Sequence, residues 1–184
     1  MISRVDSTRQ YLLANDAVSK QDKEYALNFC KKTEYLEQLK QALINELHET
    51  VASGYGDVNS NICFVFESEK AFQFLKPVLH DIFETVKLDF WDAYITFVDK
   101  TQAEYPNKYG FLMHEIYAIA PKVLYVIGET DVSYNTLNRA FAMAKVNHPA
   151  SKTFYITPEL LCSSKEEDRK ELWKMFRYLV NYKE

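Results

Sequence analysis

Four short runs of β-branched and aromatic residues recur along the chain, and a segment with helical spacing follows each of them. The runs cover residues 61–67, 92–100, 122–130 and 152–159. The helix-compatible segments cover residues 69–85, 109–120, 133–145 and 164–182. The runs begin about 30 residues apart, which is the length of one right-handed βαβ unit. The pattern therefore predicts an α/β fold, namely a three-layer α/β/α sandwich with a four-stranded parallel sheet.

The residues before the first run have helical character. Apolar side chains recur there at steps of three and four residues, at Tyr35, Leu36, Leu39, Leu43 and Leu47. This spacing predicts an amphipathic helix that packs against the rest of the chain. Residues 52–61 contain two of the chain's four glycines and predict a flexible loop. We expect a single domain over residues 1–184, with an N-terminal helical segment over 1–52 and a βα core over 61–182.

The last helical segment carries its own start signal. Ser163 is followed three residues later by Glu166, a spacing typical of a capping box. Leu172, Phe176 and Leu179 lie on one face of this helix. We expect that face to pack on the sheet.

Composition narrows the function classes. The chain has 22 basic and 26 acidic side chains and a net charge of −4, so attraction of the whole molecule to DNA is not favoured. No apolar stretch approaches the roughly 20 residues of a membrane span, so we expect no membrane partner. The three cysteines form no C-x-x-C pair, so neither a disulfide framework nor a zinc or iron-sulfur cofactor is indicated. A cytoplasmic location fits these observations, and the oligomeric state is left open.

The ends of the predicted strands are the place to look for a site, because open parallel sheets bind ligands beyond the carboxyl ends of their strands. Pro121 predicts that the helix before it stops there. We expect the apolar run after Pro121 to form a buried strand that is followed by Gly128. Three carboxylates at these ends are the candidates for catalysis: Glu67, Asp99 and Glu129. The candidate binding residues are Ser68, Phe97, Lys100, Gly128, Thr130, Asp131, Thr157 and Pro158. Carboxylates outnumber lysines here, which disfavours phosphate and favours a metal ion or a basic partner.

Three landmarks in order resemble the uracil-DNA glycosylase superfamily. They are "AYITFVDK", "FLMHEIYAIAPKVLYVIGET" and "TFYITPELL", within residues 61–182. The resemblance implies a four-stranded parallel sheet between helices, with a helical segment ahead of it. The second landmark carries Glu115, Ile116, Pro121, Lys122 and Gly128 in register with the family pattern, and these are fold positions.

The residues that carry the family's chemistry are mostly replaced. Glu67 matches the acidic residue at the head of the family's water-positioning loop, but the rest of that loop is missing. The asparagine that reads the uracil edge corresponds to Phe97, which has no polar side-chain atom. The histidine of the terminal motif corresponds to Thr157, and Pro158 matches the motif's proline. The resemblance therefore implies a fold without ordinary uracil excision.

Three interpretations follow. The first is a non-catalytic binding module with a uracil-DNA glycosylase-like fold, which acts through a protein partner in DNA replication or repair or in a host and phage interaction. The alternative is an enzyme: a divergent DNA base glycosylase, or a metal-dependent hydrolase that uses Glu67, Asp99 and Glu129. The third is an α/β domain that shares only the general pattern of βα units with that family.

Overall fold

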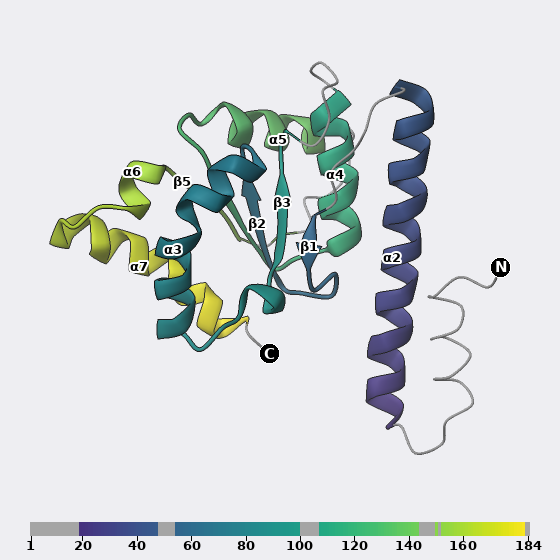
Figure 1. The fold of residues 1–184 in the computed structure, drawn as a ribbon, viewed down its shortest axis with the longest axis horizontal. Coiled ribbons are helices and arrows are strands. Elements are labelled where there is room, and N and C mark those ends of the chain that lie inside the picture. The colour runs from purple at the N-terminus through teal and green to yellow at the C-terminus, as the bar shows by residue number, and fades with distance from the viewer. Residues whose placement is uncertain (1–18, 48–53, 100–106, 144–149, 151, 183–184) are drawn as a thin grey trace.

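Strands and helices alternate along the chain in a computed structural model (Figure 1). The structure describes residues 19–47, 54–99, 107–143, 150 and 152–182. The strands are β1 (Tyr55–Gly56), β2 (Ile62–Phe66), β3 (Tyr94–Phe97), β4 (Val123–Ile127) and β5 (Lys152–Ile156). The helices are α2 (Lys20–Leu47), α3 (Glu69–Thr85), α4 (Asn107–Ile119), α5 (Val132–Met143), α6 (Pro158–Leu161) and α7 (Glu166–Asn181), with a short 3-10 helix η1 (Phe90–Asp92).

The strands form one mixed sheet in the order β1-β3-β2-β4-β5. The pairs β2–β3, β2–β4 and β4–β5 are parallel, whereas β1 runs antiparallel to β3. The predicted α/β class is confirmed. The prediction of a four-stranded and wholly parallel sheet is wrong, because β1 adds a fifth, antiparallel strand at one edge.

Alternate residues of the strands enter two apolar clusters. Phe64 and Tyr125 join the cluster that α3 and α7 complete, and Val65 and Leu124 join the one that α4 and α5 complete. Since successive side chains of a strand point to opposite faces, helices pack against both faces of the sheet. Every residue of β2 and β4 is buried, which explains their continuous apolar sequences.

The helix boundaries follow local signals. Helix α3 covers the predicted residues 69–85, and the Ser68 hydroxyl accepts a hydrogen bond from the Ala71 amide at its start. Helix α4 ends at Ile119, where Ala120 adopts a left-handed φ of 54° ahead of Pro121. A left-handed residue followed by proline cannot continue an α-helix, so the predicted stop at Pro121 is confirmed.

Two local predictions are wrong. The segment predicted as a flexible loop, residues 52–61, contains β1, which pairs with Tyr94 and Ile95. Gly56 allows this pairing, because its φ is 105° and a Cβ there would lie 1.9 Å from the Ala93 carbonyl oxygen. Ser163 does not cap the last helix: Lys165 is its N-cap without a side-chain bond, and the Ser163 hydroxyl donates to Asp168 instead.

The predicted N-terminal helix is present as α2, a helix of 28 residues that packs on α4 (Figure 1). Leu36 reaches the cluster under α4, while Tyr35 is largely exposed, and the side chains of Leu43 and Leu47 lie outside the described residues. The Tyr25 hydroxyl donates to Asp57 at 2.6 Å. Partial burial, and then this bond, raise the pKa of Tyr25 to about 12, so the hydroxyl keeps its proton through neutral pH. None of the described helices is both long and apolar enough to cross a bilayer.

Lys32 should be the main polar anchor of α2. Its ammonium donates to the Ile119 carbonyl oxygen at 2.7 Å, at the C-terminal end of α4, and to the Val58 carbonyl oxygen at 3.3 Å. Burial lowers the pKa of Lys32, so the carbonyl oxygens must replace part of its hydration. We expect Lys32→Met to lower the free energy of unfolding by about 1.5–3 kcal/mol, measured by urea unfolding. The neighbouring Lys31→Met, at an exposed position, is the control; an equal loss in both variants would contradict this role.

Candidate functional site

The strand order reverses between β2 and β4. The chain passes from β2 to β3 on one side and then to β4 on the other side of β2. In open parallel sheets the loops beyond the strands diverge at such a point and leave a crevice. In this fold the place expected for such a crevice lies between Glu67, which follows β2, and Gly128, which follows β4, and we call this place the crevice.

The side chain of Glu67 lies directly against Gly128. A Cβ added to Gly128 would come within 2.5 Å of the Glu67 Oε1 atom and 2.8 Å of its Cγ and Cδ atoms. The backbone register explains this proximity, because Phe66 and Ile127 are paired one residue earlier. Glycine at position 128 therefore makes room for the Glu67 side chain at the head of the crevice.

Asp99 joins Glu67 through the backbone. The Val98 amide donates to the Phe66 carbonyl oxygen at 2.8 Å, and the Asp99 amide donates to the Glu67 carbonyl oxygen at 3.0 Å. The pairing of β2 and β3 thus continues beyond the strands and brings Asp99 beside Glu67. Lys100, the candidate cation next to it, lies outside the described residues.

Tyr155 is a site residue that the sequence analysis did not single out. Its hydroxyl donates to the Gly128 carbonyl oxygen at 3.2 Å, so it reaches the crevice from β5. Desolvation raises the pKa of Tyr155, and the charges of Asp131, Glu67 and Glu159 raise it further. These three carboxylates therefore lie close enough to the phenol to act on its charge. Its position near the carboxyl end of a strand was the available signal, because an aromatic there can extend past the core.

Two of the candidate hydroxyls cap helices. Ser68 caps α3, and the Thr157 hydroxyl accepts a hydrogen bond from the Leu160 amide at 3.1 Å at the start of α6. Pro158 occupies the first turn of α6, where its missing amide hydrogen leaves no bond unmade. The presence of Ser68, Thr157 and Pro158 at these positions is therefore explained by helix initiation.

Phe97 belongs to the core. It is 1% exposed and packs in the cluster of α3, with its ring centroid 6.1 Å from that of Phe72 and 5.8 Å from that of Tyr55. A side chain in this position presents no ring face to a ligand. Position 97 is thus filled by a phenylalanine that is packed in the core.

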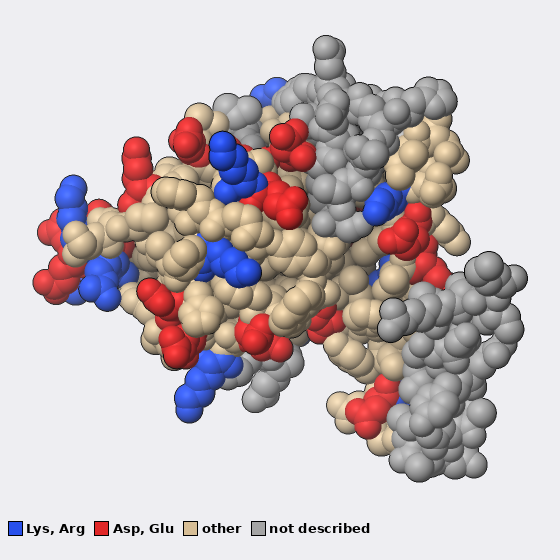
Figure 2. Space-filling model, viewed as in Figure 1, with Lys and Arg blue, Asp and Glu red and all other residues tan. Residues whose placement is uncertain are grey.

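The outer part of the site is acidic and exposed. Glu129, Thr130, Asp131 and Glu159 are exposed, and the Asp131 carboxylate accepts a hydrogen bond from the Asn135 amide group at 2.7 Å. We call the set Glu67, Asp99, Glu129, Asp131 and Glu159 the acidic rim. On the face drawn in Figure 2, acidic and basic side chains of the described residues are interspersed. The rim offers hydrogen-bond acceptors and negative charge, which suit cationic groups.

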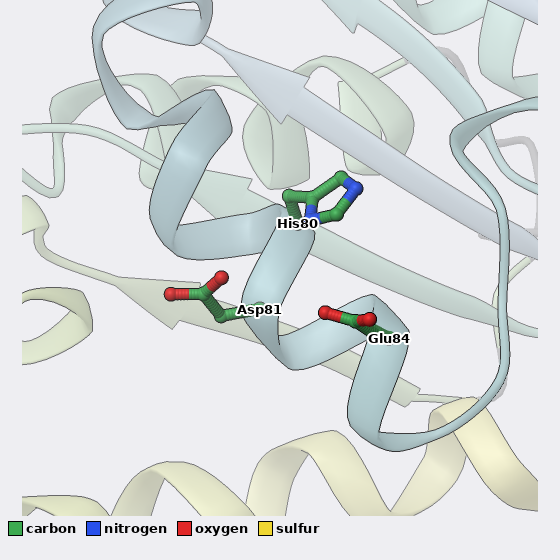
Figure 3. Close-up of side chains that lie close together, drawn as sticks. All are labelled: His80, Asp81 and Glu84. Carbon is green, nitrogen blue, oxygen red and sulfur yellow. The ribbon is translucent and has the colours of Figure 1, made fainter.

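A possible metal-ligand cluster lies elsewhere. Among the described residues, three ligand atoms within 4.8 Å of one another are found at His80, Asp81 and Glu84 on α3 (Figure 3). All three side chains are exposed and belong to the last turns of α3, which are remote from the carboxyl ends of the strands. The candidate carboxylates Glu67, Asp99 and Glu129 form no such cluster within the described chain. The spacing of His80 and Glu84 on a helical segment was the signal in the sequence.

We compared the chain with models of protein families and with characterised proteins. No family model matches the chain, and no curated protein matches it significantly.

Proposed function

We propose that the protein is a non-catalytic binding module with a uracil-DNA glycosylase-like fold and that its acidic rim binds a basic segment of a protein partner. The observation that carries the proposal is the burial of Phe97, which is 1% exposed among Phe72 and Tyr55. A base-excision site needs an open pocket with polar groups that read the flipped base. In this chain the corresponding position supports the core instead.

The crevice itself supports the same interpretation. The Glu67 side chain and the Tyr155 hydroxyl both contact Gly128, so protein atoms occupy the space in which such sheets hold ligands. Loss of a ligand pocket leaves the buried sheet intact, because fold and site depend on different residues. A packed core, together with strand ends whose side chains fill the ligand space, fits a binding module with this fold.

The negative charge of the acidic rim favours a basic protein segment as the partner. Exposed carboxylates at Glu129, Asp131 and Glu159 repel a phosphate backbone and attract lysine and arginine side chains. A basic peptide segment therefore fits this edge better than DNA does. The enzymatic alternative is not favoured, because Glu67, Asp99 and Glu129 do not converge as three metal ligands among the described residues.

The catalytic half of the proposal is tested by single-turnover incubation with labelled oligonucleotides that carry uracil, hypoxanthine or xanthine, with and without magnesium. We expect no base release and no strand cleavage. Release that disappears in Glu67→Gln would show that the protein is an enzyme and would overturn the proposal.

The binding half is tested by NMR titration with a short oligolysine peptide. We expect chemical-shift changes at the rim that weaken as salt rises from about 50 mM to about 200 mM, because exposed charges are screened. The triple variant Glu129→Gln, Asp131→Asn, Glu159→Gln should weaken binding at least tenfold. The triple variant Glu24→Gln, Glu84→Gln, Glu171→Gln removes the same charge from exposed positions elsewhere and is the matched control. Equal losses in the two variants would show that the rim is not the binding surface.

A further inference from the structure

The two edges of the sheet differ in how they end. At one edge, β1 covers β3 for only two residues. Such a short edge strand limits further pairing of a sheet. At the other edge, no strand in the described part of the chain pairs with the outer side of β5.

The register of β5 shows which backbone groups face outward. The Lys152 amide donates to the Lys122 carbonyl oxygen, and the Gly128 amide donates to the Ile156 carbonyl oxygen, both at 3.2 Å. Because alternate residues of a strand direct their backbone groups to the same side, Lys152, Phe154 and Ile156 bond to β4. The N–H and C=O groups of Thr153 and Tyr155 therefore point away from the sheet. These side chains and Phe154 are only partly buried.

We propose that the outer edge of β5 pairs with β5 of a second copy of this chain, antiparallel and about a two-fold axis at Phe154. Thr153 and Tyr155 lie symmetrically on either side of Phe154. In this register Thr153 of one copy faces Tyr155 of the other, and each such pair exchanges both of its N–H···O bonds. The outward-facing groups of both strands are then satisfied by the same element, and the two sheets become one continuous sheet.

Side chains at this edge suit the same arrangement. Phe154 would lie opposite Phe154 of the second copy, and aromatic pairs directly across antiparallel strands are stabilising. The Tyr178 ring lies tilted beside that of Phe154, with ring centroids 5.4 Å apart, and extends the apolar contact. This is an edge that a second aromatic strand can cover.

Charge selects a second copy over an extended peptide of arbitrary sequence. Lys152 is exposed at the amino end of β5, whereas Asp131 and Glu159 are exposed beyond the carboxyl ends of β4 and β5. Antiparallel pairing brings the amino end of each β5 to the carboxyl end of the other. Lys152 of each copy then approaches the acidic end of its neighbour. One strand pair is a small interface, so we expect a dimer that dissociates in the micromolar range.

The first test is sedimentation of the full chain over concentrations from about 1 µM to about 500 µM, where the wild type should pass from monomer to dimer. Thr153→Pro removes an outward N–H and leaves the bonds to β4 in place, because proline is tolerated on the free side of an edge strand. We expect it to raise the dissociation constant at least tenfold. Thr153→Val keeps the N–H and is the matched control. A wild type that stays monomeric throughout would overturn the proposal.

The second test measures the register by disulfide cross-linking. Cys162 is the exposed one of the three free cysteines, so the background is Cys162→Ser. Residue 154 would face itself in a non-hydrogen-bonded pair with Cα atoms about 4.5 Å apart, within disulfide range. Phe154→Cys should therefore form a covalent dimer under mild oxidation. Thr153→Cys alone should not, because its two copies would be separated by about 8 Å.

Two outcomes would contradict the proposed register. Cross-linking through Thr153→Cys but not through Phe154→Cys would show another arrangement and contradict the proposed axis. A folded Phe154→Cys variant, checked by circular dichroism, that stays uncross-linked would do the same. If Phe154→Cys does not fold, the double variant Thr153→Cys, Tyr155→Cys replaces it, since each cysteine would then face the other type in the second copy. None of these results depends on the function of the acidic rim.

Discussion

Replacing Phe176 with alanine is expected to lower the free energy of unfolding by about 3–5 kcal/mol. Phe176 is fully buried on the inner face of α7, and its ring centroid lies 5.2 Å from that of Tyr125 and 6.5 Å from that of Phe64. Alanine would leave a cavity between a central strand and the helix that covers it. The surrounding rings are held by the sheet and can close only part of that space.

The control for this prediction lies one turn further along α7. Val180 is 56% exposed, so Val180→Ala removes methyl groups that already contact water and should change stability by less than about 0.5 kcal/mol. Both variants are compared with the wild type by urea unfolding. An equal dependence of the free energy of unfolding on urea concentration in all three proteins would show that the cooperative transition is retained. A loss below about 1.5 kcal/mol for Phe176→Ala would mean that α7 is not an integral part of the core.

The burial of Phe176, Leu172 and Leu179 was predictable because the helical repeat leaves only one apolar face on this segment. The limits of α3 were equally accessible from sequence, since polar residues surround an apolar stripe and Ser68 offers a cap. The central strands could be recognised because a parallel strand covered on both faces is apolar throughout. These signals are local, so one sequence is enough to reveal them.

The two wrong local predictions have different physical causes. A two-residue strand such as Tyr55–Gly56 has no periodicity, and only its pairing with Tyr94 and Ile95 defines it. The Ser163 hydroxyl could bond either to a backbone amide at the helix start or to a nearby carboxylate. In the structure it donates to Asp168, and Lys165 is the N-cap of the helix. Sequence alone cannot rank such competing bonds.

One part of the candidate site was predictable from the sequence, and another part was not. The placement of Glu67 and Gly128 at the same edge of the sheet was expected, because each follows a strand of the predicted parallel sheet. The direction of a side chain near a strand end depends on the register, and a shift of one residue reverses it. Phe97 therefore lies in the core and Tyr155 reaches the crevice, although both are aromatic residues near the carboxyl ends of their strands.

Phe97→Asn is expected to destabilise the protein by about 3–5 kcal/mol without creating uracil excision. The substitution places an amide among Tyr55, Phe72 and the strand residues around position 97, where the phenylalanine is 1% exposed. An amide group in this apolar cluster loses its water partners and leaves part of the ring volume empty. Its direction is set by the strand, so it points into the core and away from any oligonucleotide.

Phe97→Leu separates the two effects of that substitution. Leucine keeps the position apolar and should cost less than half as much stability as asparagine, so the difference measures the burial of the amide. Urea unfolding of both variants and a uracil-release assay of Phe97→Asn provide the measurements. A stable Phe97→Asn variant that releases uracil would require position 97 to open toward a base pocket. The absence of release together with the large destabilisation would show that position 97 serves the packing of the core.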